Sequence, residues 1–219
     1  MNTKYRQKIL DLTKKYRDEL DKCDFSHNSD HLFRVERLAK SIAKEEGADM
    51  EIIEAACLIF DVARDLEDKG KIEDHAEEGV KIAKEILAKI NFPSDKIEKV
   101  SHAIFVHRRS KDRIPETLEA KILRDADYLD AMGAIDVARV ISSSLESIKY
   151  KRPIYIEKPY KSDEDNNKSA INFMIYKLKH EKHQPENFLT KRGREIARDR
   201  YKFSKEYVER FIDEWQGKR

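Results

Sequence analysis

The stretch Ile-Leu-Arg-Asp-Ala-Asp-Tyr-Leu-Asp-Ala-Met-Gly-Ala-Ile, residues 122–135, combines a helical apolar pattern with three aspartates. Asp127 lies among apolar residues with helical spacing, so the sequence predicts that its carboxylate is carried on a largely buried helix. A buried carboxylate without a partner is costly, and a cation is therefore expected to meet it. The helix is expected to span about 118–145 and to break near Gly133.

A second aspartate has the same setting in Ala-Cys-Leu-Ile-Phe-Asp-Val-Ala-Arg-Asp, residues 56–65. The surrounding helix, expected over about 50–63, is apolar on nearly every face, which is typical of a central buried helix. Asp61 therefore needs a positive partner as well, and either a metal ion or Arg64 would serve.

Apolar residues recur with a helical period through most of the chain, and the sequence predicts an all-α protein. Six Gly and five Pro in 219 residues are too few for a sandwich or barrel. The other helices are expected at about 3–20, 31–46, 74–90, 94–107, 169–182 and 190–215. The expected helix-terminal residues are Ser29 or Asp30, Gly47, Asp49, Asp74 with Glu77 in a capping box, Ser94, Pro115 and Thr190.

The expected organisation is one helical domain over 1–219, with a core at about 25–145 and a C-terminal elaboration at about 146–219. A long loop over 150–168 contains Tyr155, Tyr160 and Lys161, which are expected either to cover a pocket or to form a dimer contact.

The composition excludes several classes of protein. The formal charge of +2, from 45 basic and 43 acidic residues, argues against a dedicated nucleic-acid binder. No apolar run is long enough to span a membrane, and no signal peptide is expected. Two cysteines without metal-binding or disulfide spacing favour a reducing compartment, and we expect the cytoplasm.

Seven histidines are present, and a scattered histidine is usually structural, as we expect for His102, His180 and His183. The others belong to a constellation of short strings. These are HNSDHLFRV at 27–35, ACLIFDVARD at 56–65, DHAEEG at 74–79, AIFVHR at 103–108 and ILRDADYLDAMGAI at 122–135. Their order and spacing, together with the C-terminal strings SAINFMIYKL and LTKRGREIARDRYKF, closely resemble the HD-domain superfamily of metal-dependent phosphohydrolases, in its small single-domain branch.

This resemblance implies an HD-type helical bundle and a set of metal ligands. The first metal histidine falls on His31, the central His-Asp pair on Phe60 and Asp61, and the final aspartate on Asp127. Asp125 is the alternative final ligand. Members with a second metal have two further histidines, which match His75 and His107.

The implied activity is hydrolysis of a small phosphorylated compound such as a nucleotide. A divalent Mn, Fe, Ni, Zn or Mg ion suits imidazole and carboxylate ligands, and it would activate water and polarise a phosphoryl oxygen. Arg64 and Asp65 are expected to bind or protonate around the phosphate, although a salt bridge is an equal alternative for Arg64. The resemblance leaves a homo-oligomer open.

One position departs from the family pattern, because Phe60 stands where the family places a metal-binding histidine. Three consequences stay open. The remaining His31, Asp61 and Asp127 still hold a metal, the centre shifts toward His75 and His107, or the domain is degenerate and binds a phosphorylated ligand or partner without hydrolysis.

Two further groups have alternative interpretations. Arg108 and Arg109 are either substrate clamps or part of a solvated basic run, and Arg113 is expected to be solvated. His27 and Asn28 are either pocket residues or part of the cap of the following helix.

Overall fold

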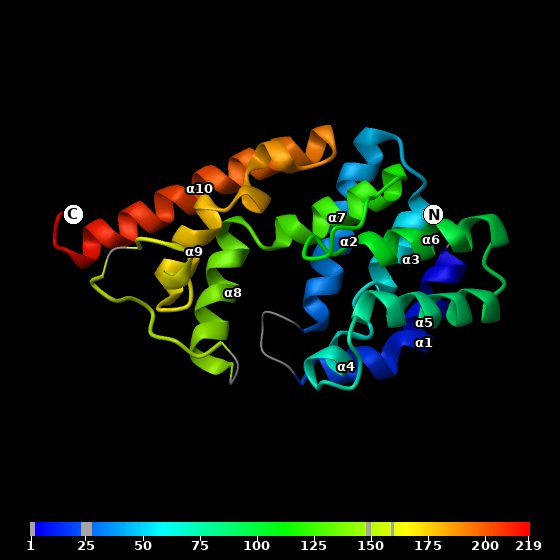
Figure 1. The fold of residues 1–219 in the computed structure, drawn as a ribbon. Helices are drawn as coiled ribbons and strands as arrows, with labels where there is room; N and C mark the ends of the chain where they lie inside the picture. The colour runs from blue at the N-terminus through cyan, green and yellow to red at the C-terminus, as the bar shows by residue number, and fades with distance from the viewer. Residues whose placement is uncertain (1–2, 23–27, 148–149, 159) are drawn as a thin grey trace. The chain divides into compact units, whose positions relative to one another are not determined.

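The computed structural model describes residues 3–22, 28–147, 150–158 and 160–219. Over these ranges the chain forms helices and loops without a strand, which confirms the all-α prediction (Figure 1). The helices are α1 (Thr3–Leu20), α2 (Ser29–Glu46), α3 (Met50–Ile59), α4 (Arg64–Asp68), α5 (His75–Lys89), α6 (Ser94–Val106), α7 (Leu118–Asp130), α8 (Gly133–Glu146), α9 (Ala170–Lys179) and α10 (Lys191–Trp215), with short 3₁₀ turns at η1 (Asp163–Asp165), η2 (Glu181–His183) and η3 (Pro185–Asn187).

The described residues group into two compact units. The first contains residues 3–22, 28–127 and 189–193, and the second contains 128–147, 150–158, 160–188 and 194–219. The expected division into a core at about 25–145 and an elaboration at about 146–219 stays a prediction.

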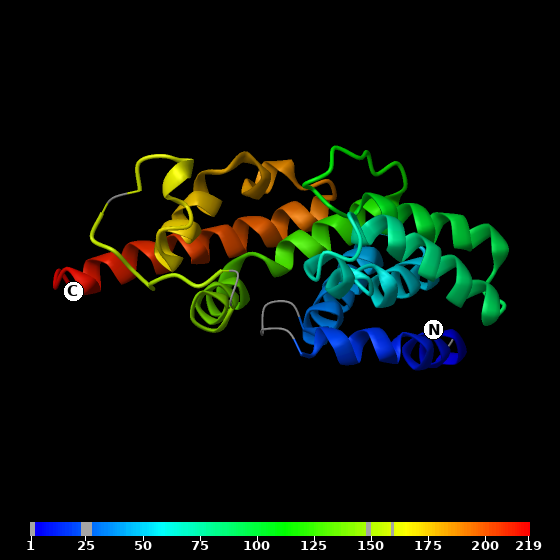
Figure 2. The same ribbon diagram turned by 60° about the horizontal axis from the view of Figure 1, so that its bottom comes forward.

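Helix α3 is the buried centre of the first unit, as its continuous apolar pattern predicts. Residues 52–60 are all buried, and α1, α2 and α6 contact this helix. Helices α5 and α6 pack side by side (Figure 2). Gly79 permits the approach of α5, because a Cβ atom there would lie 3.3 Å from Ile104 and 3.4 Å from the Phe60 carbonyl oxygen.

The end of α3 differs from the prediction. The helix stops at Ile59 rather than at residue 63, and residues 60–63 form a turn before α4. The backbone changes to tighter hydrogen bonds, from Val62 N–H to the Ile59 carbonyl and from Arg64 N–H to the Asp61 carbonyl. Because all four turn residues are buried, their apolar composition gives no signal of a break. The turn places Asp61 at the end of the buried helix.

Several helix termini agree with the predictions. Gly47 ends α2 in the left-handed conformation, and the Asp49 carboxylate accepts the Glu51 and Ile52 N–H groups at the start of α3. Asp74 likewise accepts the Ala76 N–H at the start of α5.

Others differ. Helix α2 begins at Ser29, two residues before the expected start. Ser94, the expected cap of α6, is instead the first residue of that helix. The expected capping box at Glu77 is wrong, because that side chain pairs with Arg113 at 2.7 Å. Pro115 lies before the first turn of α7, where the Thr117 hydroxyl instead accepts the Ala120 N–H.

The second unit is built from α8, α9 and the greater part of α10. Its buried residues Val140, Ala170, Ile171, Met174 and Val208 form one apolar cluster. The predicted break at Gly133 is confirmed, with φ of +77° at the start of α8. Tyr155 packs its ring against Phe211 and Trp215 of α10, so it belongs to this unit's own packing.

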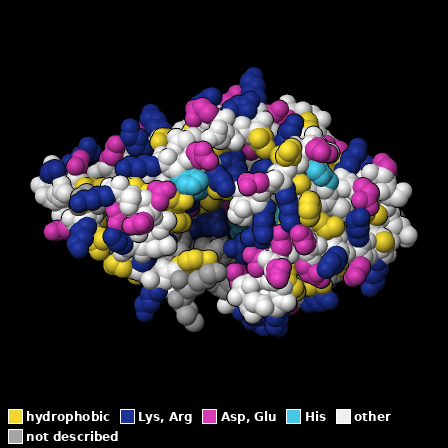
Figure 3. Space-filling model, in the orientation of Figure 1, with side chains coloured by type: hydrophobic (Ala, Val, Ile, Leu, Met, Phe, Trp, Pro, Cys, Tyr) yellow, Lys and Arg dark blue, Asp and Glu magenta, His cyan; other side chains and the backbone are white. Residues whose placement is uncertain are grey.

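Acidic and basic side chains are interspersed over the face shown in Figure 3, as the balanced composition predicts. Within the described ranges, no helix has the length and apolar character needed to cross a membrane.

Candidate metal centre

Asp61 brings together two predicted histidines within the first unit. Its Oδ1 atom lies 3.1 Å from Nε2 of His75 and 3.4 Å from Nε2 of His107. The two Nε2 atoms are themselves 3.3 Å apart. Asp61 comes from the turn after α3, His75 from the first turn of α5 and His107 from the residue that follows α6. All three are buried, so the ends of three elements converge on one point.

The far nitrogen of each ring fixes how that ring is protonated. His107 Nδ1 lies 2.6 Å from the Ile104 carbonyl oxygen, which can only accept a hydrogen bond. His75 Nδ1 lies 2.7 Å from a carboxylate oxygen of Glu67. Each Nδ1 therefore carries the proton as donor, and in the neutral ring each Nε2 presents a lone pair.

This arrangement gathers three electron-pair donors. Asp61 Oδ1 is buried and has no hydrogen-bond partner, although two Nε2 atoms lie within 3.4 Å. Adjacent lone pairs repel unless a positive charge lies between them, and a divalent ion ligated by imidazole and carboxylate meets that need. Among the described residues, Asp61, His75 and His107 form one of two groups whose ligand atoms lie within 4.8 Å of one another. The donor set therefore fits a divalent metal.

The other predicted ligands lie on the opposite side of Asp61. His31 Nε2 is 3.2 Å from Asp127 Oδ1 and 3.8 Å from Asp61 Oδ2. The fully buried ring of Phe60 lies near both His31 and His107. Its ring centroid is 5.7 Å from that of His31 and 5.1 Å from that of His107. A carbon ring thus lies between two imidazoles and offers no lone pair to a cation.

Asp125, the alternative final ligand, has a different set of partners. Its carboxylate accepts the backbone N–H groups of Leu189 and Thr190 and the Thr190 hydroxyl, and it contacts Arg109 at 3.4 Å. Burial raises the pKa of Asp125 against these hydrogen bonds. The carboxylate beside His31 is that of Asp127.

Electrostatics keep Asp61 ionised. Burial opposes its charge, but the neighbouring imidazoles of His75 and His107 and the charge of Arg64 hold the pKa of Asp61 well below its usual range. The carboxylate is therefore an anion available to a cation at neutral pH.

The predicted catalytic pair already has ionic partners. The Arg64 side chain meets Asp68 at 3.3 Å, one helical turn later. Asp65 is buried and pairs with Lys69 at 2.8 Å. The salt-bridge alternative for Arg64 is thus present, and the catalytic roles of Arg64 and Asp65 stay predictions.

The prediction of a solvated basic run after His107 is wrong for its arginines. Arg108 pairs with Glu67 and Asp74, Arg109 with Asp125, and Arg113 with Asp74 and Glu77. Their side chains are 17%, 7% and 16% exposed, because they turn inward to carboxylates from distant segments. Glu67 carries no signal in the sequence, because it resembles any other acidic residue until its contacts are seen.

Two other predicted structural residues are confirmed as such. His102 Nε2 accepts the Glu116 N–H, and His180 Nδ1 accepts the Lys182 N–H. In the second unit, Asp130 is buried and pairs with Arg139 at 2.7 Å. His27 lies outside the described residues, and Asn28 precedes α2 without a side-chain cap hydrogen bond.

Comparison with known proteins agrees with this constellation. The HD domain family model matches residues 28–132, which contain all five predicted ligands. A crystal structure described as a predicted HD superfamily hydrolase, from an uncultured Thermotogales bacterium, is 32% identical over 95% of this chain and 92% of that one, with a TM-score of 0.68. The chain belongs to the HD superfamily.

Other solved structures extend this likeness over nearly the whole chain. An HD-superfamily hydrolase from Bacillus thuringiensis is 26% identical, covers 97% of this chain and 98% of that one, and has a TM-score of 0.71. YpgQ of Bacillus subtilis (strain 168) is 32% identical over 117 residues, and this match covers only 55% of YpgQ. A crystal structure of YpgQ shares the fold across 96% of each chain, with a TM-score of 0.65 and 24% identity.

Proposed function

We propose that this HD-superfamily protein is a metal-dependent phosphohydrolase that acts on a small phosphorylated compound. The observation that carries the proposal is the buried Asp61 Oδ1, which has no hydrogen-bond partner and faces two Nε2 atoms. HD domains bind divalent metals, and this donor set is suited to one.

Asp61, His75 and His107 would hold the metal. The centre would then lie away from His31 and Asp127, the ligands of the set in which Phe60 replaces a histidine. When bound, a divalent ion activates water and polarises a phosphoryl oxygen. His31 and Asp127 lie beside Asp61 Oδ2, where their polar atoms would orient a water or hold a second ion. The ion belongs to the set Mn, Fe, Ni, Zn or Mg.

A nucleotide is the substrate class we favour. The crystal structure of YpgQ, which shares this fold, holds ADP. Arg64 would bind phosphate oxygens by exchanging its bond to Asp68, since guanidinium groups suit such oxygens. Asp65, held by Lys69, would donate or accept a proton near the phosphate. We place the reaction in the cytoplasm, where the buried free thiol of Cys57 would stay reduced.

The test begins with metal analysis of protein purified without chelator, followed by assays of a nucleotide panel with and without Mn²⁺. We expect about one bound ion per chain and release of phosphate or pyrophosphate that requires the metal. His75→Ala and His107→Ala should lose both metal and turnover, whereas His180→Ala, a histidine of the second unit, should retain them. Full turnover in the metal-stripped protein, or in His75→Ala, would refute the proposal.

A second candidate rests on Phe60, whose ring touches both His31 and His107. Without a nitrogen at that position, the domain would bind a phosphorylated ligand or partner without hydrolysing it. Calorimetric titration with ADP, paired with phosphorus NMR of the same sample, separates the two. Binding without turnover under every metal condition supports the degenerate domain, and metal-dependent turnover excludes it.

A further inference from the structure

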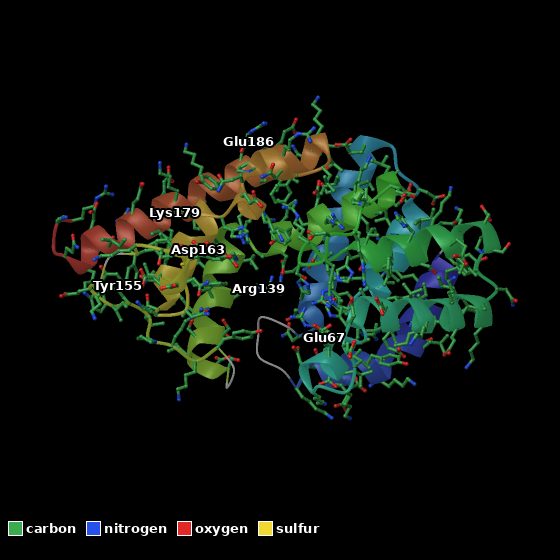
Figure 4. All side chains as sticks on the ribbon, in the orientation of Figure 1. Glu67, Arg139, Tyr155, Asp163, Lys179 and Glu186 are labelled. Atoms are coloured by element: carbon green, nitrogen blue, oxygen red, sulfur yellow. The ribbon has the colours of Figure 1, made fainter. Side chains whose placement is uncertain are left out.

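We propose that Glu67 and Arg108 form a clamp that positions the two imidazoles of the proposed metal centre. The inference rests on the proposed function and adds two positioning residues to it. Glu67 lies on α4 (Figure 4), and Arg108 directly follows His107 along the chain.

Glu67 holds His75 at two points. One carboxylate oxygen, Oε2, accepts both the His75 backbone N–H and its ring Nδ1–H, each at 2.7 Å. Two bonds to one residue fix both the backbone position and the ring orientation. The carboxylate can only accept, so Nδ1 keeps the proton and Nε2 points its lone pair toward Asp61.

Arg108 joins this residue to the other imidazole. Its Nη1 and Nη2 atoms bond both oxygens of Glu67, at 2.8 and 3.1 Å. A paired guanidinium and carboxylate is the most directional ion pair available to a protein. Arg108 directly follows His107 in the chain. Its ion pair with Glu67 therefore connects the residue that holds His75 to the residue next to His107. This connection would help to hold the two Nε2 atoms at their spacing of 3.3 Å.

The same contacts argue against a second metal at Glu67, Asp74 and His75, although their ligand atoms also lie close together. Arg108 contacts both carboxylates, at 2.8 Å for Glu67 and 2.9 Å for Asp74. Arg113 adds a second positive charge 2.9 Å from Asp74. Two guanidinium groups already neutralise these two acids, and the cluster supports the centre instead of forming another.

The test compares Co²⁺ binding and the Co²⁺ absorption spectrum in the metal-stripped wild type and in variants. Glu67→Ala should weaken Co²⁺ binding by about 10- to 100-fold and alter the spectrum, because His75 loses its orientation. Glu67→Gln keeps an acceptor for the ring N–H but loses one bond to Arg108, so its loss should be smaller. Arg113→Gln is the matched control, since it removes a cation from the same network without touching Glu67, and it should bind Co²⁺ as the wild type does.

A second readout needs no metal. Imidazole ¹⁵N NMR of the metal-free wild type should show His75 protonated at Nδ1, and Glu67→Ala should lose this preference, with circular dichroism confirming that it folds. Unchanged Co²⁺ affinity and an unchanged His75 tautomer in Glu67→Ala would overturn the clamp. If the wild type binds no Co²⁺, the proposed function fails, while the NMR comparison still decides whether Glu67 orients His75.

Discussion

The two carboxylate oxygens of Asp61 have different side chains around them in the first unit. Oδ1 meets two imidazoles within 3.4 Å, and each ring has its far nitrogen bonded to an acceptor. Oδ2 is the oxygen that faces His31, with its Nε2 atom at 3.8 Å. The first side has the donor set of the proposed metal site, and the second side has His31, the Asp127 carboxylate and the ring of Phe60.

Ligand identity and ligand orientation are therefore separate requirements for a metal site. His75 and His107 converge on Asp61 Oδ1 because a carboxylate and a carbonyl oxygen orient their rings. On the Oδ2 side the Phe60 ring fills space that a nitrogen ligand would share. We therefore propose a single metal on the Oδ1 side.

The largest effect is expected from a substitution that removes the Asp61 carboxylate, which both sides share. Asp61→Asn replaces the anionic ligand by a neutral amide of equal shape, and metal affinity should fall by about 100-fold or more. Turnover should fall in parallel. Metal analysis and phosphate release measure both, and Asp112→Asn, an exposed carboxylate in the loop before α7, is the control. Metal content equal to the wild type in Asp61→Asn would place the centre elsewhere.

The next effect compares the two sides directly. His107→Ala should weaken metal binding by about 100-fold, because it removes one of three converging donors, whereas His31→Ala should weaken it by about 10-fold or less. Competition with a coloured chelator gives both affinities on one scale. The reverse order would show that the ion lies beside His31 and Asp127, where the family resemblance placed it.

A third variant would give the Oδ2 side of Asp61 a second imidazole, as the Oδ1 side has. Phe60→His supplies a ring nitrogen next to His31 and Asp61, and we expect a second equivalent of metal with an increase in turnover of about 10-fold. Metal stoichiometry and the nucleotide assay are the measurements, with Phe60→Leu as the control for lost packing around a fully buried ring. One equivalent in both variants would indicate that the missing ring nitrogen at residue 60 is not what limits metal binding on the Oδ2 side.

The helices follow from local pattern in the sequence, and the candidate ligands follow from the resemblance to the HD superfamily. The apolar period identifies the helices of the first unit, and spaced motifs identify Asp61, His75 and His107, which the structure brings within 3.4 Å of one another. The break after Ile59 escapes prediction because residues 60–63 are all buried and, apart from Asp61, as apolar as the helix before them. Burial in that segment is a property of the folded unit and carries no turn signal.

The support of the site is harder to predict than its ligands. Glu67 is one of 43 acidic residues, and its role depends on Arg108, 41 residues later in the chain. Arg109 reaches Asp125 in the same way, so a basic segment that looks solvated is instead half-buried and paired. Ion pairs between distant segments depend on how helix ends meet, which a helical period does not encode.

The smallest effect concerns the start of the helix that carries His75. Although burial opposes ionisation, a hydrogen bond from the Ala76 N–H and the charges of Arg108 and Arg113 lower the pKa of Asp74 to about 2. A lowered pKa stabilises the fold above the ordinary value near 4, and this stabilisation is lost as the pH falls toward 2.

Asp74→Asn keeps a good helix cap but loses the charge, so the free energy of unfolding at pH 7 should fall by about 1–2 kcal/mol. The difference from the wild type should shrink between pH 4 and pH 2, as urea denaturation at several pH values would show. Metal affinity should change by only a few-fold, because Glu67 still holds the His75 ring. A pH-independent difference would mean that the lost contribution is the cap and not the ion pairs with Arg108 and Arg113.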